Sequence, residues 1–331
     1  MNKLERIQAA LNREPVDRIP YALWCHFPEM DHSPAGLAQA ALRFQQRYGS
    51  DFLKLTPASG YAVEDWGCVA SDKVMPDGHR PCASHAITSA SEWGKIKPLD
   101  IVSSGYGREV ETLIRVVVDR RADAPVVPTL WSPLTLARKL SGDRLNQDLR
   151  ERPRAVVEAL EAITDTLLRF LALCLAEGAQ GIFYAIQAAS RRFHTEAEYA
   201  EFGEPYDRRL LQAAMEGTQF VIVHCHGDEL MFERLARLPA HAWNWDDRAE
   251  GPSLREGKAR VGGAVIGGVN QWATVRDGTP EDVRAEVKDA VEQTEGIGLI
   301  VGPGCVLPQR APEENVVALV KALGGKVSLS L

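Results

Sequence analysis

The stretch QFVIVHCHG, residues 219–227, decides how this chain can fold. Its centre is a run of apolar, mostly β-branched residues, which is typical of a strand buried on both faces of a parallel sheet. Similar runs recur along the chain and are separated by amphipathic segments of helical length. We expect such strands at residues 18–27, 51–57, 124–135, 180–190, 219–227, 241–246, 263–270 and 298–305.

The alternation of strands and helices predicts the fold class. Eight expected strands with helices between them indicate an α/β fold, the (β/α)8 or TIM barrel. Helices are expected at 33–49, where Ser33 is a good N-cap, and at 149–178 and 196–217. The segment from about 57 to 123 is too long for a simple crossover, so we expect an insertion between strands two and three that caps the barrel mouth. No linker divides the chain, and residues 1–331 are expected to form a single domain.

Composition narrows the classes of function. The chain has 331 residues, 45% hydrophobic and 25% charged, which is ordinary for a globular protein. Its net charge of −7 with mixed signs and no basic stripe argues against nucleic-acid binding. The apolar stretches are too short and too charged to span a membrane, and the N-terminus looks like an amphipathic helix rather than a signal peptide. Six cysteines without a CxxC motif are expected to be reduced, and the protein to be cytoplasmic.

Three residues at the ends of expected strands could hold a metal ion. His224 and His226 point to the same side of a strand because they are two residues apart, while Cys225 faces away. Cys305 ends the eighth expected strand in the glycine turn GPGC. The carboxyl ends of all strands meet at one mouth of a barrel, so two imidazoles and a thiolate can converge there. These groups are good ligands for zinc, and three ligands with one open position are typical of a catalytic site.

A simpler interpretation of these three residues stays open. Histidines on a buried strand are often held by hydrogen bonds within the protein, and Cys305 could be a small buried apolar residue. The same donor atoms also suit copper, nickel and iron, so the sequence does not select zinc over another metal ion.

Polar residues end most of the other expected strands, where the chemistry of such barrels takes place. His26 could act as a general acid or base, or be a hydrogen-bonded residue of the rim. Asp246 could be a fourth ligand or a carboxylate that orients an imidazole, and an acidic pair with Asp247 at a helix start is the alternative. Arg248 could clamp a substrate carboxylate or pair with these aspartates. We expect His26, Asp246 and Arg248 to be catalytic.

A further set of residues is expected to bind the substrate. Some are amide side chains at strand ends, and others are aromatic side chains near the mouth that would exclude water. Aromatic residues beside a barrel are also normal packing, so this signal is weaker. The expected substrate-binding residues are Tyr61, Trp66, Gln187, Asn244, Trp245 and Asn270.

Four stretches resemble the uroporphyrinogen decarboxylase superfamily, and the resemblance covers nearly the whole chain. They are ERIQAALNREPVDRIP (5–20), VIVHCHGD (221–228), IGGVN (266–270) and IVGPGCVLPQRAPEENVVAL (300–319). The resemblance implies a (β/α)8 barrel and one of two chemistries. One is decarboxylation of a tetrapyrrole without a metal, and the other is zinc-dependent methyl transfer to a thiol, often from a methylated corrinoid protein. Cobalamin-independent methionine synthase is similar to the second branch at a greater distance.

The chain departs from each branch at particular residues. The decarboxylases carry arginines after the first strand, where this chain reads ALWCHFPEM (22–30) without one. The methyltransferases carry His-x-Cys on strand five and a cysteine in a glycine-rich turn on strand eight. His224 and Cys305 match the first and last ligands of that pattern, and His226 replaces its cysteine. The resemblance is therefore closer to the methyltransferase branch, with one thiolate fewer at the site.

The resulting hypothesis is a zinc-dependent methyltransferase that moves a methyl group from a corrinoid, or another activated donor, to a small thiol. Zn²⁺ on His224, His226 and Cys305 would lower the pKa of a thiol in the open position. The corrinoid would arrive on a partner protein, because no corrinoid-binding module is recognisable in the chain. Related barrels often dimerise, so a homodimer is one expected assembly. The alternatives are a decarboxylase of a small or aromatic acid or of a tetrapyrrole, with or without a metal, and a non-catalytic barrel that binds a tetrapyrrole, corrinoid or metal.

Overall fold

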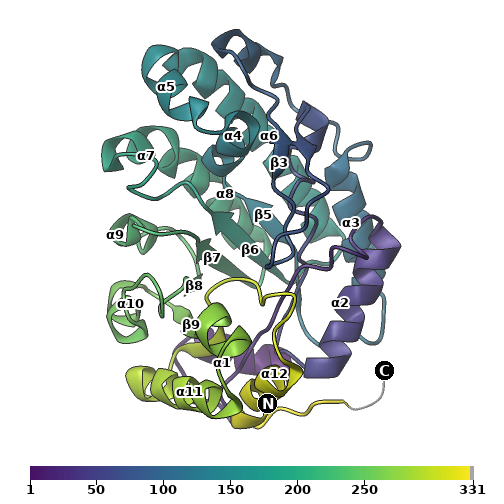
Figure 1. Ribbon diagram of the computed structural model, residues 1–331, viewed down its shortest axis with the longest axis vertical. Coiled ribbons are helices and arrows are strands. Elements are labelled where there is room, and N and C mark those ends of the chain that lie inside the picture. The colour runs from purple at the N-terminus through teal and green to yellow at the C-terminus, as the bar shows by residue number, and fades with distance from the viewer. Residues whose placement is uncertain (329–331) are drawn as a thin grey trace.

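Parallel strands form the centre of the computed structural model, which describes residues 1–328 (Figure 1). The regular sheet has six strands, and each neighbours the next in chain order. They are β5 (Thr129–Trp131), β6 (Gly181–Ile186), β7 (Phe220–Cys225), β8 (Ala242–Asn244), β9 (Ala264–Val269) and β10 (Leu299–Pro303). This order, with helices in the connections, is that of the predicted α/β barrel.

The first two strands of the barrel are only partly formed. The segment expected at 18–27 is extended, but it makes a single isolated parallel bridge, from Tyr21 to Val301 on β10. β1 (Leu53–Lys54) pairs with β4 (Val126–Val127), and Pro128 separates β4 from β5. Proline has no N–H to donate, so it interrupts a ladder at such positions. The Asp51 amide donates to the Tyr21 carbonyl at 2.8 Å, which connects the first segment to the second and completes the ring.

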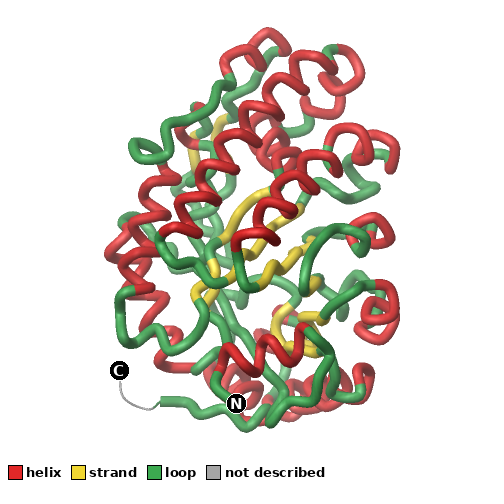
Figure 2. Tube along the Cα trace, turned by 180° about the vertical axis from the view of Figure 1, so that it is seen from behind, coloured by secondary structure: helices red, strands yellow, loops and turns green. Residues whose placement is uncertain are grey.

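Helices cover the outside of the strands, as the view from behind shows (Figure 2). Ser33 caps α2 (Pro34–Tyr48), as predicted. The helix expected at 149–178 begins later, at Pro153, as α6 (Pro153–Ala176), and the helix expected at 196–217 is divided at Gly203 into α7 (Glu196–Phe202) and α8 (Glu204–Gly217). The others are α1 (Lys3–Leu11), α4 (Pro133–Ser141), α5 (Arg144–Glu151), α9 (Phe232–Leu235), α10 (Leu254–Arg260), the π-helix η3 (Gln271–Arg276), α11 (Pro280–Thr294) and α12 (Glu313–Ala322). Within residues 1–328, no helix combines the length and apolar character needed to cross a membrane.

The long segment after β1 contains a hairpin and one ordinary barrel helix. It includes η1 (Glu64–Trp66), the antiparallel pair β2 (Val69–Ala70) and β3 (Cys82–Ser84), and η2 (Ala90–Lys95). Helix α3 (Gly105–Val117) then packs against α2 and belongs to the outer helical layer. The part that departs from the barrel pattern therefore ends before α3, earlier than residue 123, where we expected the insertion to end.

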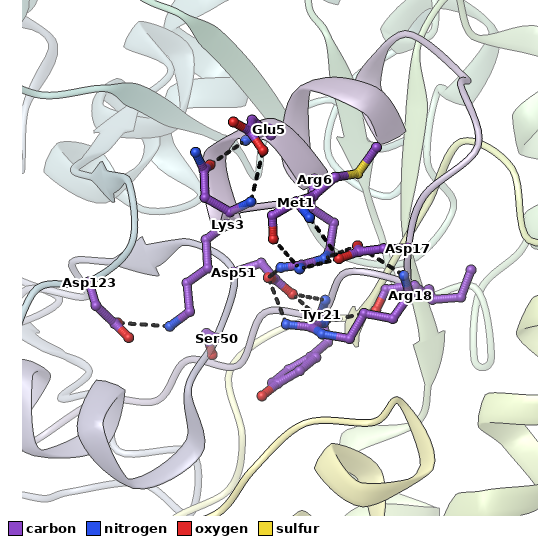
Figure 3. Close-up of polar contacts among 12 residues, drawn as sticks. Met1, Lys3, Glu5, Arg6, Asp17, Arg18, Tyr21, Ser50, Asp51 and Asp123 are labelled. Atoms are coloured by element: carbon purple, nitrogen blue, oxygen red, sulfur yellow. Dashed lines mark hydrogen bonds and ion pairs between the residues drawn. The ribbon is translucent and has the colours of Figure 1, made fainter.

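The end of the barrel that carries α1 is held by a cluster of charged side chains (Figure 3). Asp51 is fully buried and accepts hydrogen bonds from Arg6, Arg18 and the amide of Tyr21. Arg6 also pairs with Asp17 at 2.7 Å. These contacts join α1 to the first two strand segments, where the backbone ladder is sparse.

Candidate metal centre

The alternation of side chains along β7 directs His224 into the barrel. Ile222 belongs to the core cluster inside the barrel, whereas Val223 and Cys225 pack in the cluster between the strands and the helices. His224 is buried and lies on the same face as Ile222, with its ring 5.1 Å from that of Phe183. Cys225 thus faces the helical layer, as the period of a strand predicts.

His224, His226 and Cys305, here called the ligand triad, come together at the carboxyl ends of β7 and β10. The Sγ atom of Cys305 is 3.8 Å from Nε2 of His224 and 3.5 Å from Nδ1 of His226. The three donor atoms all lie within 4.8 Å of one another. Burial lowers the pKa of both His224 and His226, so both imidazoles are neutral near pH 7 and keep a lone pair for a cation.

Asn244 on β8 fixes which nitrogen of His224 faces the triad. Its Nδ2 donates to the carbonyls of Ile266 and Pro303, at 3.0 and 3.1 Å. Its Oδ1 must therefore accept, and it lies 2.6 Å from Nδ1 of His224. His224 consequently carries its proton on Nδ1 and directs the bare Nε2 toward Cys305. Asn244 was expected to bind substrate, but it is fully buried and acts on the histidine instead.

The ligand triad lines a cavity of about 260 Å³, called the inner cavity below. His26 and Gln187, both predicted site residues, also line it. Burial lowers the pKa of His26 to about 3, and its buried Nδ1 has no hydrogen-bond partner within the described residues. His26 is therefore a neutral group with a free nitrogen near the triad, consistent with a contact to a bound molecule.

Two lysines in the inner cavity were not predicted from the sequence. Lys54 on β1 contacts Thr56 Oγ1 at 3.1 Å, and its Nζ lies 4.5 Å from the ring centre of Phe183. Lys139 on α4 lies in the same way over Trp131, at 4.5 Å. In the part of the chain that the structure describes, neither ammonium has a carboxylate within 4.0 Å. Burial lowers the pKa of Lys54 to about 7 and that of Lys139 to about 8.

Of these two lysines, only Lys54 could have been singled out from the sequence, by its position. It interrupts the apolar run DFLKLTP of an expected buried strand, and lysine is seldom fully buried without a partner. Lys139 has no such signal, because it stands among polar and apolar residues of an ordinary amphipathic helix.

Asp246 supports the loop that carries Cys305. Its Oδ2 accepts from Gln271 Nε2 at 2.8 Å, and Gln271 Oε1 accepts from the amide of Gly304 at 3.0 Å. A Cβ atom on Gly304 would lie 2.5 Å from the Cα of Asp246, so only glycine fits there. Asp246 also borders an adjacent cavity with His226 and Cys305. The carboxylate thus supports the cysteine loop, a role that was not among those considered for Asp246 from the sequence.

Arg248, which we expected to be catalytic, does not reach the inner cavity. Its guanidinium donates to the carbonyls of Gly268 and Glu286 and pairs with Asp289 on α11. It also lies 3.4 Å from Asp247, which is the ion pair weighed as the alternative. The arginine therefore joins the strand end to the helical layer.

Four residues expected to bind substrate instead make hydrogen bonds and packing contacts within the protein. The Tyr61 hydroxyl donates to the Thr129 carbonyl from a buried position, and Trp66 donates to the Lys97 carbonyl. Trp245 is buried against Phe232 and donates to the Pro252 carbonyl. Asn270 caps η3, with its Oδ1 accepting from two backbone amides. These four side chains therefore do not point into the barrel mouth as predicted. They face the helical layer or close a helix end.

Comparisons with known proteins agree on one family. The sequence profile described as uroporphyrinogen decarboxylase (URO-D) matches residues 2–325. A methylcobamide:CoM methyltransferase of Methanosarcina mazei is 22% identical over 335 residues, 96% of each chain. A uroporphyrinogen decarboxylase of Neisseria meningitidis is 26% identical over 256 residues, 74% of this chain and 70% of that protein. A solved structure described as a methyltransferase from Methanosarcina mazei has a TM-score of 0.80 at 20% identity and covers 98% of both chains.

Proposed function

The chain belongs to the uroporphyrinogen decarboxylase (URO-D) family of enzymes, and we propose that it transfers a methyl group from a corrinoid to a small thiol, with zinc bound by His224, His226 and Cys305. The observation that carries the proposal is the convergence of these three side chains on one cavity. The methylcobamide:CoM methyltransferases among the relatives support the choice of donor and acceptor.

The residues of the ligand triad fit a zinc ion. Two neutral imidazoles and one thiol are borderline-soft donors, and three such ligands leave a fourth position for an exogenous group. The Asn244 amide that orients His224 is the kind of supporting contact that zinc-binding histidines have. When bound, zinc would lower the pKa of a thiol in the fourth position and so supply a thiolate near pH 7.

The inner cavity favours an acceptor thiol that carries a negative charge. Lys54 and Lys139 place two ammonium groups without carboxylate partners in the same cavity as the triad. A buried charge is costly unless an opposite charge meets it, so an anionic group on the acceptor would offset that cost. Gln187 is free to donate from the same wall, because its side chain has no hydrogen bond to the described residues that would hold it elsewhere.

The decarboxylase alternative has less support in this chain. The segment after the first strand has no arginine, and His26 and Phe27 stand there instead. The positive charges in the inner cavity come from two lysines, on β1 and α4, which are few for a tetrapyrrole with several carboxylates. Methyl transfer uses the ligand triad directly, whereas a metal-free decarboxylase would leave it without a role.

The experiment that tests the proposal combines metal analysis with an assay of methyl transfer. We expect about one zinc ion per chain, and transfer from methylcobalamin to mercaptoethanesulfonate. Cys305→Ala should lose both, because it removes the one sulfur ligand. Cys225→Ala is the matched control, since Cys225 is the neighbouring cysteine that faces the helices. Purified wild-type protein that folds but binds no metal would contradict the proposal.

A further inference from the structure

An aspartate and a histidine on the hairpin form a close pair beside the inner cavity. Nδ1 of His79 lies 2.6 and 2.7 Å from the two carboxylate oxygens of Asp77. The amide of His79 also donates to Asp77 at 3.2 Å. Because Nδ1 is occupied by the carboxylate, Nε2 is the nitrogen left to act on another molecule. Both side chains are partly exposed, at 25% for Asp77 and 38% for His79.

The loop that carries this pair is fixed to the barrel. The Gln309 amide donates to the Pro76 carbonyl at 2.9 Å, and its Nε2 donates to the His26 carbonyl at 2.8 Å. Gly78 between the two residues has φ +93° and lies against His26. Arg80, just after the pair, forms a 3.0 Å ion pair with Asp31, which is almost fully buried. The Asp77–His79 pair therefore has a defined position over the strand ends.

The same cavity contains the pair and the ligand triad. Asp77 and His79 line the inner cavity together with His224, His226 and Cys305. His79 also lines a second cavity of about 450 Å³ between the hairpin and α4, called the outer cavity below. An imidazole at this position can exchange a proton with a molecule beside the triad on one side and with solvent on the other.

We propose that His79 is a catalytic residue that accepts the proton of the acceptor thiol, and that Asp77 is the positioning residue that holds its imidazole. This inference rests on the proposed function. As the thiol settles beside the ligand triad, its S–H bond breaks, the sulfur keeps the electron pair, and a new N–H bond forms at Nε2. Asp77 stays ionised and stabilises the resulting imidazolium. His79 keeps this proton while the thiol is bound, and the proton leaves to solvent through the outer cavity only after the methyl group has been transferred.

Two measurements with mercaptoethanesulfonate as the probe test this assignment. In His79→Ala the kcat of methyl transfer from methylcobalamin should fall about 100-fold or more, which is the usual contribution of a general base. Calorimetric titration in buffers of different ionisation enthalpy should show more protons released on thiol binding, because the imidazole no longer retains them. Zinc content should not change. Asp77→Asn should lower kcat at constant KM, and it should cost nothing further in the His79→Ala background.

His85→Gln is the matched control for these variants. His85 is an exposed histidine of the same hairpin that contacts the Lys139 carbonyl at 2.9 Å, and it lines the outer cavity but not the inner cavity that contains the triad. Equal proton release by wild type and His79→Ala, or a kcat of His79→Ala within twofold of wild type, would overturn the role of His79. Absence of methyl transfer in zinc-loaded wild type would instead count against the proposed function, while the proton count would still test His79.

Discussion

The buried side-chain amide of Asn244 determines how the His224 ring is oriented at the metal centre. Its three hydrogen bonds, to Ile266, Pro303 and His224, leave the side chain no other orientation. Removal of the amide frees the His224 ring to rotate and takes one donor away from each of two buried carbonyls. We expect Asn244→Ala to weaken zinc affinity 10- to 100-fold, as is usual for such supporting contacts, and to lower the free energy of unfolding by about 1–3 kcal/mol. Chelator competition and urea unfolding measure the two effects.

Asn315 provides the control for this variant. It is also buried, and its Nδ2 donates to the carbonyls of Val275 and Gly278 rather than to any residue of the triad. Asn315→Ala should destabilise the fold to a similar degree and leave zinc affinity unchanged. If both variants weakened zinc binding equally, Asn244 would have no special role in orienting His224.

Lys54 should make the free energy of unfolding increase as the pH rises above neutrality. Burial lowers its pKa in the folded protein from 10.5 to about 7. Between these values the unfolded chain binds a proton that the folded chain does not, so stability should rise with pH across that window. Below about 7 both states are charged, and the folded protein bears the full cost of burying the ammonium.

We therefore expect Lys54→Met to stabilise the fold most at pH 7 or below, with a gain that shrinks as the pH approaches 10.5. Urea unfolding of both proteins at several pH values measures this difference. The same variant should raise KM for mercaptoethanesulfonate and leave KM for uncharged mercaptoethanol unchanged. A gain in stability that did not vary with pH would contradict a buried, unpaired ammonium.

At the scale of elements, the hairpin depends on Gly78 to reach the barrel. Its φ of +93° is strained for other residues, and a Cβ there would lie 2.7 Å from the Cβ of His26 and 2.4 Å from Gln309 Nε2. We expect Gly78→Ala to displace the loop of residues 75–80 and to increase amide hydrogen exchange there. Gly67→Ala is the control. Gly67 has φ +105°, but the nearest atom to its Cβ would be 3.7 Å away. Both substitutions bear a backbone cost of about 1–2 kcal/mol, and only Gly78→Ala should release the loop.

The elements show which parts of the molecule the sequence could predict. The apolar runs located the strands, and the period of two residues correctly assigned His224 to the interior and Cys225 to the helices. Proline positions explain the shortfalls, since Pro128 divides one strand and Pro153 delays α6. The position of a residue at a strand end did not predict where its side chain points. Trp245 packs against Phe232 on α9, Arg248 pairs with Asp289 on α11, and Asn270 closes η3, so each side chain is directed by a helix whose placement depends on the whole fold.

The family resemblance read from the sequence is confirmed, and it explains why the triad could be found when its surroundings could not. Ligand positions follow from a short motif on each of two strands. Lys54, Lys139 and the Asp77–His79 pair come from three other segments, and only the closed barrel and the hairpin bring them to the same cavity. In the sequence these residues belong to no motif and look like ordinary polar or charged residues.

At the scale of the whole molecule, the candidate metal centre and the charged side chains that stabilise the ring lie at opposite ends of the barrel. The ligand triad stands at the carboxyl ends of the strands, whereas the charged cluster of Figure 3 joins α1 to the start of the first two strands. The backbone ladder is sparse at these two strands, because Tyr21 makes one bridge to Val301 on β10, β1 pairs with β4 over two residues, and the Asp51 amide bonds the Tyr21 carbonyl between them. Side chains therefore close the ring where backbone hydrogen bonds are few, and Asp51 is the acceptor they share.

Asp51→Ala should consequently destabilise the whole fold without altering the metal centre. It would leave Arg6 and Arg18 without their common carboxylate, and loss of one partner of a buried ion pair typically costs about 3–5 kcal/mol. Urea unfolding should show this loss, whereas Asp119→Ala, which removes an exposed pair with Arg121, should change stability by less than about 0.5 kcal/mol. At temperatures where Asp51→Ala remains folded, its zinc content should equal that of wild type. Loss of zinc from the folded variant would mean that the strand ends are not positioned independently of the opposite end of the barrel.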